Sequence, residues 1–499
     1  MERYSPILQL IALLILLPSP LNHNLANTTI DLKTDESSLL AFKSHITSDS
    51  SHTTLGKNWT TKTSVCSWVG VTCGSRHRRV TALDISYMSL EGTISPHIGN
   101  LSFLVSLNIT GNRFHGDLPE ELAHLHRLRV LHFSNNSFAG ELPRTWFANM
   151  TNGLEELYLS YNNFNGTIPQ EIGHLSNLRV FSMGYNQLSG QIPASTLSQC
   201  SQLQELWLSS NNFSGTLPKE IGNMTQLQIF DAYNNSITGT IPQEIGHLSN
   251  LRVFSMGYNK LSGQIPASTL SQCSWLQELW LSSNSFSGTL PKEIGNMTQL
   301  HIFEASNNSI TGTIPQEIGN LSNLRILNMG YNKLSGQIPV STLSQCSQLQ
   351  KLDLSDNPFS GTLPKEIGNM TQLQLFYAYS SNITGSIPPE IGKLHSLQDL
   401  DLSNNMLLGK IPQEIGHLSN LRDLYIGDNK LSGQIPASSL SQCSQLQHID
   451  LSNNSFSGTL PKEIGNMTQL QSFSANDNNI TERRSQNWND GYCSIVLVV

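Results

Sequence analysis

Charged residues are scarce in this sequence. Asp, Glu, Lys and Arg together make up 13% of the 499 residues, and the formal net charge is -8. Basic residues gather only between Arg76 and Arg79 and at the pair Arg483 and Arg484. Because nucleic-acid binding depends on a concentrated basic surface, this composition argues against nucleic acid as a partner.

The sequence also lacks an apolar run long enough to cross a membrane. The longest run, from Ile7 to Leu17, has about half of the ~20 residues that a membrane-spanning helix needs. It follows a basic residue, Arg3, and precedes small or polar residues near Ala26. This arrangement predicts a secretory signal peptide over residues 1–26 and an extracellular protein, with no membrane span in the chain.

Catalytic and metal-binding motifs are missing as well. The sequence contains no GxxxxGK[ST], no HExxH, no kinase catalytic loop and no GxSxG elbow. His124 and His126 have no Cys or carboxylate partners at metal-ligand spacing, which favours a surface position over a metal site. We therefore predict a protein that is not an enzyme and has neither a cofactor nor a metal site.

Internal repetition is the dominant feature of the sequence. A block of 73 residues recurs almost unchanged, with equivalent glycines at Gly166, Gly239, Gly312 and Gly385, and the repetition continues to Thr481. Each block divides into units of 24 or 25 residues that contain L-x-x-L-x-L-x-x-N, the leucine-rich repeat signature. The predicted fold is an α/β solenoid, a horseshoe or superhelix of about seventeen coils over residues 80–481, with one parallel strand per coil forming a concave sheet.

The alternation of residues within a unit predicts which side chains are buried. In the unit LQELWLSSNNFSGTLP, Leu206 and Leu208 point inward, whereas Trp207 points outward onto the concave face. The amide of the Asn that follows the strand is expected to bond backbone groups left unpaired by the turn. Fifteen of seventeen such positions are Asn, and because Met88 and Ser381 interrupt the ladder, we expect reduced stability around Ser381.

Residues 27–79 differ from the repeats and are predicted to form an N-terminal cap. A solenoid's first coil has an apolar face without a neighbour, and the segment DESSLLAFKSHI has the apolar spacing of a helix that could cover it. Cys66 and Cys73, close together in a secreted segment, are predicted to form a disulfide. The four cysteines that recur with the block occupy inward positions too far apart for disulfides and are predicted to be core thiols; they are Cys200, Cys273, Cys346 and Cys443.

The cap TDESSLLAFKSHI, the box CSWVGVTC and units of the form LxxLxLxxNxLxGxIPxxIGxL resemble the ectodomains of plant leucine-rich repeat receptor kinases. The class that senses bacterial elicitor proteins is the most similar, and the resemblance spans Thr34 to Thr481. It implies plant-type repeats with a G-x-I/L-P insertion, and a role in plant immune or developmental signalling. It also implies a peptide or protein ligand on the concave or lateral surface and a co-receptor leucine-rich repeat kinase near the C-terminal end.

The repeat pattern breaks after Thr481, where Glu482 replaces the expected glycine. The segment 482–499 contains no second cysteine-pair cap, no membrane span and no kinase, and we expect it to be disordered. It is either the end of a natural short form, secreted into the apoplast, or a gene model that has run past an exon end. The abrupt break favours the second interpretation, in which the parent gene encodes a receptor truncated here before its membrane span and located in the plasma membrane.

Outward aromatic and acidic residues on the strands of the fifth to tenth units are the predicted ligand site. Large exposed rings are common anchors of binding surfaces, and acidic neighbours would select a basic peptide segment. Repeat duplication is an alternative explanation, because Trp207 and Trp280 are copies of one residue. The predicted residues are Tyr185, Trp207, Asp231, Tyr233, Tyr258, Trp280 and Glu304.

Two further features bear on function. Eighteen Asn-x-Ser/Thr sequons fit a secreted protein, with glycans expected at Asn58, Asn108, Asn223, Asn296 and Asn369, and a glycan at Asn108 would obstruct one end of the concave face. Outward carboxylates, among them Asp353, Asp401 and Asp450, could imitate a glycosidase pair, but an open concave sheet favours a solvated surface. The alternative function is that of a free secreted inhibitor of microbial cell-wall hydrolases.

Overall fold

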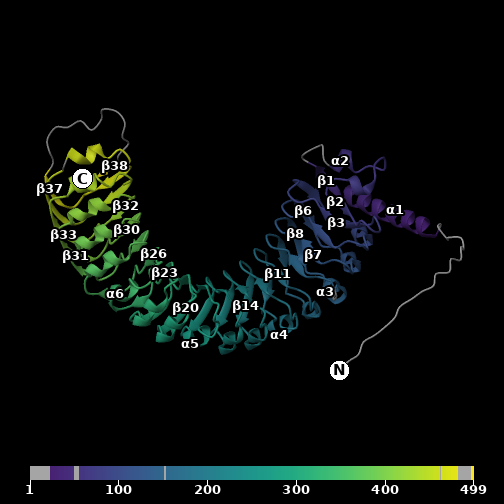
Figure 1. Ribbon diagram of the computed structural model, residues 1–499, viewed down its shortest axis with the longest axis horizontal. Coiled ribbons are helices and arrows are strands. Elements are labelled where there is room, and N and C mark those ends of the chain that lie inside the picture. Colours follow the sequence, from purple (N-terminus) through teal and green to yellow (C-terminus); the bar gives the residue numbers. More distant parts are fainter. Residues whose placement is uncertain (1–22, 50–54, 151–152, 461, 482–495, 499) are drawn as a thin grey trace, which may run out of the picture.

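The computed structural model describes residues 23–49, 55–150, 153–460, 462–481 and 496–498. These residues form one curved solenoid, with the main strands along the inner edge of the arc and short helices along the outer edge (Figure 1). Most of the predicted signal peptide and most of the predicted disordered tail lie outside the described residues. The solenoid confirms the predicted fold class.

The main sheet lines the concave surface, and each coil adds one parallel strand to it. Consecutive strands pair in a constant register, so that Glu205, Ile229 and Val253 lie side by side, as do Trp207, Asp231 and Ser255. At the N-terminal end β2 (Val71–Cys73) pairs antiparallel with β3, and at the other end β38 (Val496–Val498) pairs with β36. The seventeen strands of the coils are β3 (Val80–Asp84), β5 (Ser106–Asn108), β7 (Val130–His132), β9 (Glu156–Tyr158), β11 (Val180–Ser182), β13 (Glu205–Trp207), β15 (Ile229–Asp231), β17 (Val253–Ser255), β19 (Glu278–Trp280), β21 (Ile302–Glu304), β23 (Ile326–Asn328), β26 (Lys351–Asp353), β28 (Leu375–Tyr377), β30 (Asp399–Asp401), β32 (Asp423–Tyr425), β34 (His448–Asp450) and β36 (Ser472–Ser474).

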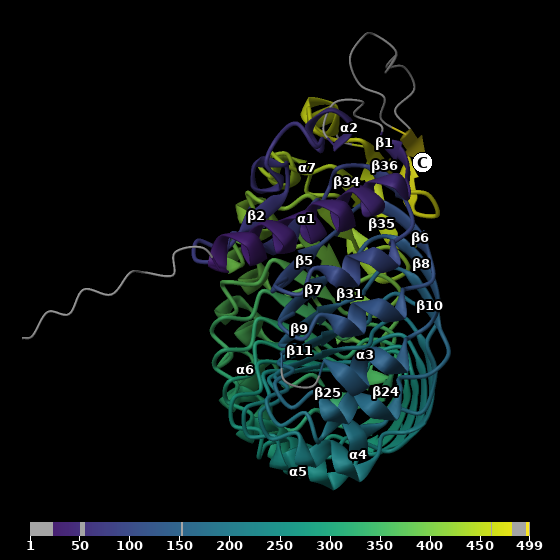
Figure 2. The same cartoon turned by 90° about the vertical axis from the view of Figure 1, so that its right-hand side faces the viewer.

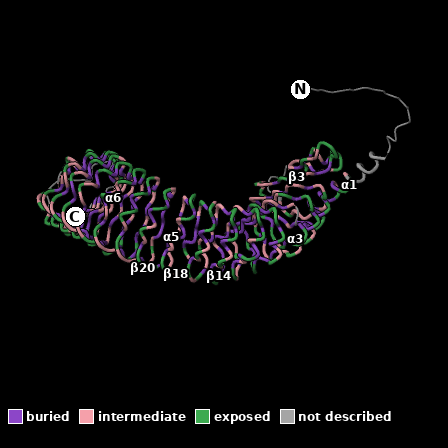
Figure 3. Tube along the Cα trace, turned by 60° about the horizontal axis from the view of Figure 1, so that its bottom comes forward, coloured by how far each residue is buried: buried purple, intermediate pink, exposed green. Residues whose placement is uncertain are grey.

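The core runs through the whole solenoid between this sheet and the convex side. Leu206 and Leu208 are fully buried, as the period-two alternation predicts, and equivalent residues of the other coils continue the core along the arc (Figure 3). The recurring cysteines belong to this core: Cys200, for example, is 3% exposed and its thiol donates to the carbonyl of Ile172 at 3.2 Å. All four described free cysteines are buried, which confirms the prediction of core thiols.

A second series of short strands follows the turn in each coil. Most of these strands pair in parallel with their counterparts in the next coil, but the series is interrupted between β10 and β12 and on both sides of the pair formed by β25 and β27. The strands are β4 (Leu90–Gly92), β6 (Arg113–Gly116), β8 (Ser137–Glu141), β10 (Asn163–Asn165), β12 (Ser189–Gly190), β14 (Asn212–Thr216), β16 (Ser236–Gly239), β18 (Lys260–Gly263), β20 (Ser285–Thr289), β22 (Ser309–Gly312), β24 (Lys333–Leu334), β25 (Gly336–Gln337), β27 (Phe359–Ser360), β29 (Thr384–Gly385), β31 (Met406–Gly409), β33 (Lys430–Gly433), β35 (Ser455–Thr459) and β37 (Asn479–Thr481).

Short helices cover the convex side because an I/L-P step follows the second strand in most coils and starts a helical turn. The proline usually precedes the first helical residue, a position where its fixed φ fits and no backbone N–H is needed. The helices are η2 (Pro96–Asn100), η3 (Glu120–His124), α3 (Arg144–Asn149), η4 (Gln170–His174), α4 (Ala194–Leu197), η5 (Lys219–Asn223), η6 (Gln243–His247), α5 (Ala267–Leu270), η7 (Lys292–Asn296), η8 (Gln316–Asn320), α6 (Val340–Leu343), η9 (Lys365–Asn369), η10 (Pro389–Lys393), η11 (Gln413–His417), α7 (Ala437–Leu440) and η12 (Lys462–Asn466).

The predicted asparagine ladder is present. In a typical rung, Asn405 Nδ2 donates to the carbonyls of Ala378 and Leu402, and Oδ1 accepts from the backbone N–H of Ile383. The amide thus ties two successive coils together at the turn. Ser381 has only a weak substitute for these bonds, a contact of 3.3 Å from its hydroxyl to the carbonyl of Tyr379.

The N-terminal cap combines α1 (His23–Ser44), β1 (Ile46–Asp49), α2 (Leu55–Asn58) and η1 (Val65–Ser67). α1 lies across the first coils and contacts η2 (Figure 2), while β1 pairs antiparallel with β4. The predicted disulfide between Cys66 and Cys73 is present, with the two Cα atoms 5.5 Å apart. Sequence reasoning missed a buried ion pair, in which Arg79 of the RHRR segment donates two bonds of 2.8 Å to Asp35 of the cap helix.

Candidate functional site

The concave surface presents its side chains in columns that run from coil to coil. The first outward column holds the first residue of each three-residue strand, such as Glu205, and the second outward column holds the third residue, such as Trp207. The third outward column lies two residues later, at Tyr233 for example. The next residue forms a turn column in which φ is positive, for example +55° at Asn234.

Trp207 and Trp280 lie in the second outward column, as predicted, with two strands between them. The strand spacing sets them about 14 Å apart. Each indole N–H donates at 3.0 Å to a carboxylate two residues earlier on its own strand, Glu205 and Glu278 respectively. Both rings are half-buried, so they face the concave surface in a fixed orientation rather than standing free in solvent.

Tyr185 and Tyr258 do not lie on the strands, where the sequence analysis placed them. They occupy the turn column, with φ of 56° and 53°, and are 47% and 52% exposed. A bulky residue at positive φ is uncommon because of steric strain. Tyr185 stacks on Tyr161 at 4.2 Å between ring centroids, and Tyr258 lies 5.0 Å from Tyr233, so each forms a paired aromatic edge beside the sheet.

The two predicted acidic residues differ in exposure. Asp231 is half-buried and its Oδ1 accepts the backbone N–H of Tyr233 at 3.1 Å. Glu304 is only 9% exposed, so the expectation of a solvent-facing carboxylate was wrong at this position. Burial raises the pKa of Glu304, although its bond of 2.7 Å from the Ser306 hydroxyl opposes the rise.

Sequence reasoning did not recognise a second group of polar and aromatic residues as one site. Along the second outward column, five consecutive strands carry Asp353, Tyr377, Asp401, Tyr425 and Asp450. Carboxylate and phenol therefore alternate strictly from β26 to β34. The signal was present in the sequence, but it becomes visible only when the strands are aligned in register.

The first outward column adds further charges to this region. Tyr377 donates its hydroxyl to Asp399 Oδ2 at 2.6 Å, and His448 Nδ1 lies 2.6 Å from Asp423 Oδ1. Burial raises the pKa of Asp399. These two pairs join β28 to β30 and β32 to β34 on the C-terminal half of the concave surface, which we call the C-terminal polar network together with the second outward column of β26 to β34.

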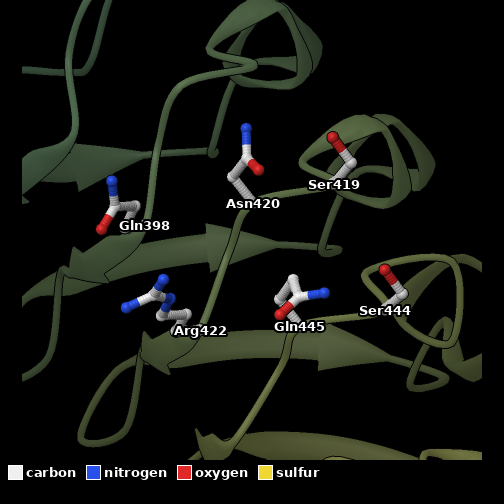
Figure 4. Close-up of a pocket in the computed structure, with 6 residues that line it drawn as sticks. All are labelled: Gln398, Ser419, Asn420, Arg422, Ser444 and Gln445. Carbon is white, nitrogen blue, oxygen red and sulfur yellow. The ribbon is translucent and has the colours of Figure 1, made fainter.

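Beside this network, a polar depression lies where the chain enters strands β30, β32 and β34. Figure 4 shows the lining side chains, which are Gln398, Ser419, Asn420, Arg422, Ser444 and Gln445. Amides and hydroxyls dominate, with one guanidinium and no carboxylate. Among the described residues, no group of three or more His, Cys, Asp or Glu side chains is arranged to hold a metal ion.

The predicted glycosylation sites fall into two structural classes. Asn223, Asn296 and Asn369 are exposed at the C-terminal ends of η5, η7 and η9. Asn58 and Asn108 are half-buried, and their side-chain oxygens accept backbone N–H groups from Val69 and Thr110. Glycosylation at all five remains a prediction, and the first class offers better access.

Sequence comparisons identify the repeats and the cap. A model described as "Leucine-rich repeat region" matches residues 80–212 and 178–311, and one described as "Leucine rich repeat N-terminal domain" matches residues 32–74. A putative receptor-like protein kinase of Arabidopsis thaliana is 49% identical over 87 residues, which is 17% of this chain and 8% of that protein. The Arabidopsis thaliana LRR receptor-like serine/threonine-protein kinase EFR is 42% identical over 88 residues, 18% of this chain and 8% of that protein. The matches therefore span a small part of the length of these curated relatives.

Structural comparisons cover most of the chain. The PEPR1–AtPEP1 complex matches 90% of this chain and 66% of that chain, with a TM-score of 0.79 and 32% identity. The plant peptide hormone receptor RGFR1, in complex with RGF2, matches 87% of this chain and 72% of that chain, with a TM-score of 0.77 and 32% identity. The Arabidopsis receptor kinase HAESA, in complex with the peptide hormone IDA and the co-receptor SERK1, matches 90% of both chains, with a TM-score of 0.59 and 28% identity. In the described part of this chain, no helix has the length and apolar character needed to span a membrane.

Proposed function

Because the chain belongs to the leucine-rich repeat family of plant receptor ectodomains, we propose that it binds an extracellular peptide or protein ligand in plant immune or developmental signalling. The observation that carries this proposal is the concave surface itself. Its inward residues are fixed by packing, while its outward columns display aromatic and acidic side chains held in place by their own hydrogen bonds. The RGFR1 structure is described as a peptide hormone receptor in complex with RGF2, and the HAESA structure as a complex with the peptide hormone IDA, which supports a peptide ligand here.

The proposed ligand site is the central concave surface of β11 to β21. Trp207, Trp280 and Tyr233 would supply apolar contact area, and the exposed Tyr185 and Tyr258 would border the ligand at the turn edge. Asp231, which is half-buried on the same surface, would favour a ligand with a basic segment. A co-receptor kinase of the same repeat class, docking near the C-terminal end, would complete a signalling complex as in the HAESA structure, which contains SERK1.

The test uses the purified full chain secreted from plant cells and a panel of synthetic bacterial elicitor peptides, with binding measured by calorimetry. For a peptide that binds, the double variant Trp207→Ala, Trp280→Ala should lose several kcal/mol of binding free energy if both rings are anchors. The matched control is Trp275→Ala, because Trp275 is 56% exposed in the turn before β19 and outside the outward columns. An unchanged affinity in a folded double variant would move the site elsewhere.

The alternative function, inhibition of microbial cell-wall hydrolases, predicts different results when the same purified protein is assayed. An inhibitor would lower the activity of a fungal or bacterial wall hydrolase at stoichiometric concentration and would bind no short peptide. The acidic and aromatic concave surface could occupy an enzyme cleft, but the RGFR1 structure is described as that of a peptide hormone receptor and the HAESA structure as a complex with a peptide hormone. Hydrolase inhibition without peptide binding would therefore replace the receptor proposal.

A further inference from the structure

The alternating column of Asp353, Tyr377, Asp401, Tyr425 and Asp450 has a defined spacing. Each carboxylate is separated from the next by two strand steps, because one tyrosine-bearing strand lies between them. Two steps correspond to roughly 9 to 10 Å. The three carboxylates, Asp353, Asp401 and Asp450, are therefore evenly spaced across the strands from β26 to β34, and we call this row of charges the charge ruler.

Repeat duplication does not explain this alternation. In the earlier copies of the block, Trp207 and Trp280 occupy the position that Asp353 and Asp450 occupy in the later copies. In the same way, Ser182 and Ser255 occupy the position that Tyr425 occupies later. The inward Leu, Ile or Phe of each strand remains buried in every copy. The outward residues have thus diverged between copies while the core residues have kept their character, and in the later copies the divergence produced regularly spaced charge.

A pair of tyrosines and a buried serine lie at the β26 end of the column. The hydroxyls of Tyr331 and Tyr379 are 2.7 Å apart and belong to coils on either side of the β26 coil, so this bond crosses that coil. Ser355 lies in the crossed coil, two residues after Asp353, and is fully buried, yet its Oγ has no hydrogen-bond partner in the structure. A buried hydroxyl without a partner costs free energy, and the backbone N–H of Ser355 donates to Asp353 Oδ1 at 3.2 Å, which orients the first carboxylate.

The spacing also identifies the conformation of the partner. A polyproline II helix rises about 3.1 Å per residue with three residues per turn, so every third side chain lies on one face at intervals of about 9.3 Å. That interval matches the distance between successive carboxylates. Tyrosine rings between the charges suit the proline rings that would lie between basic residues, since Pro-rich segments bind aromatic-lined surfaces.

We propose that the concave surface of β26 to β34 binds an extended, proline-rich peptide segment with Lys or Arg at every third position, aligned across the strands. The inference rests on the proposed function as a ligand-binding ectodomain and adds the chemical class of the ligand. The basic side chains pair with Asp353, Asp401 and Asp450, and the intervening residues contact Tyr377 and Tyr425. The Tyr331–Tyr379 pair borders the β26 end of the segment.

The charge balance of this surface supports the pairing. Burial raises the pKa of Asp401, and repulsion from Asp353 and Asp450 adds to the rise, so the central carboxylate is repelled by both of its neighbours in the column. The first outward column of the same strands holds Lys351 and His448 together with the carboxylates Asp399 and Asp423. A cationic ligand would relieve the repulsion between the carboxylates.

The experiment measures binding of synthetic peptides to the purified full chain at physiological salt. The probe is a peptide of repeated Lys-Pro-Pro triplets, and the control peptide has the same composition with its lysines clustered at one end. The triplet peptide should bind at least about tenfold more tightly than the clustered peptide, because only its charges match the ruler. Equal affinity for the two peptides would overturn the proposal.

Matched protein variants test the named residues. The triple variant Asp353→Ser, Asp401→Ser, Asp450→Ser should lose at least about tenfold in affinity for the triplet peptide. Serine is chosen because Asn at these positions would create Asn-Leu-Ser sequons, and because its hydroxyl retains an acceptor for the turn. The control carries the same charge change at the exposed turn-column residues, Asp356→Ser, Asp428→Ser and Asp477→Ser, and should change the affinity by less than about threefold.

The outcomes separate this inference from the proposed function. If an elicitor peptide binds in a Trp207-dependent manner but the triplet peptide does not bind, the receptor proposal stands and the charge ruler is refuted. If both triple variants lose affinity equally, the effect is general electrostatics and the ruler is again refuted. If no peptide of either kind binds, the proposed function itself fails.

Discussion

Ser381 marks a missing rung in the asparagine ladder, and replacing it with asparagine should stabilise the solenoid. At the neighbouring rung, the Nδ2 group of Asn405 donates to two carbonyls of successive coils at 2.8 and 3.0 Å. By the repeat spacing, an asparagine at position 381 would reach the corresponding carbonyls of Leu354 and Ala378. The second series of strands is also interrupted close to this position, around β27.

The magnitude follows from counting only the bonds that would be new. Two additional carbonyl bonds contribute about 0.5 to 1.5 kcal/mol each. The new amide oxygen at position 381 would face the backbone N–H of Phe359, but that group already donates to the carbonyl of Asn357 at 2.8 Å, so we count no gain there. Ordering the longer side chain and losing the Ser381 contact with Tyr379 offset part of the gain. We expect a net stabilisation of about 1 to 2 kcal/mol.

Denaturant unfolding combined with native-state hydrogen exchange is the appropriate assay, because coils of a solenoid can open locally. Ser381→Asn should slow exchange of backbone amides in the coils of β26, β28 and β30. The matched control is Asn405→Ser, which removes an existing rung and should lower stability by about 1 to 3 kcal/mol. The reasoning is refuted if the control destabilises as expected while Ser381→Asn leaves exchange unchanged or accelerates it.

Two other perturbations test the cap and the concave carboxylates. Arg79→Met should destabilise the N-terminal cap by about 3 to 5 kcal/mol, because it leaves Asp35 charged and buried without its partner; thermal unfolding that matches the unmodified chain would contradict this role. Burial raises the pKa values of Glu304, Asp399 and Asp401 in the folded chain. At a pH that lies between the unfolded and the folded pKa of such a group, the folded chain therefore binds more protons than the unfolded chain. Stability should therefore rise as pH falls from neutral through these raised pKa values, and Asp401→Ser should flatten the dependence of melting temperature on pH; an unchanged slope in that variant would refute the assignment.

Much of the fold could be predicted from the sequence because each coil repeats one local rule. Period-two alternation placed Leu206 and Leu208 in the core, and the recurring asparagine predicted bonds now seen at positions such as Asn405. The cysteine spacing predicted the Cys66–Cys73 disulfide. These features depend on neighbours within one coil or in the next, so a single unit contains nearly all the information.

The features that were missed depend on contacts between coils or on exact turn geometry. Alternation alone cannot show that Glu304 is nearly buried or that Tyr258 lies in a turn with positive φ, because both depend on how neighbouring side chains pack. The Asp35–Arg79 pair joins residues that are 44 positions apart, and no repeat pattern links them. The sequence analysis also treated the acidic outward residues as a solvated face, and only the strand register shows that they alternate with tyrosines.

The internal copies offer a way to distinguish scaffold from function within one chain. Trp207 and Trp280 are identical because their blocks are near-identical, so their repetition carries little weight as evidence for a site. Asp353 and Asp450 occupy the same place in later copies whose buried residues still pack as leucine, isoleucine and phenylalanine. Core packing does not require a carboxylate at an outward position, although each of these two carboxylates also accepts the backbone N–H two residues later in its turn. Burial raises the pKa of Asp401, and repulsion from Asp353 and Asp450 adds to the rise. We infer that ligand binding contributes to the retention of these charges, which makes the C-terminal half of the concave surface, rather than the duplicated tryptophans, the more informative place to test first.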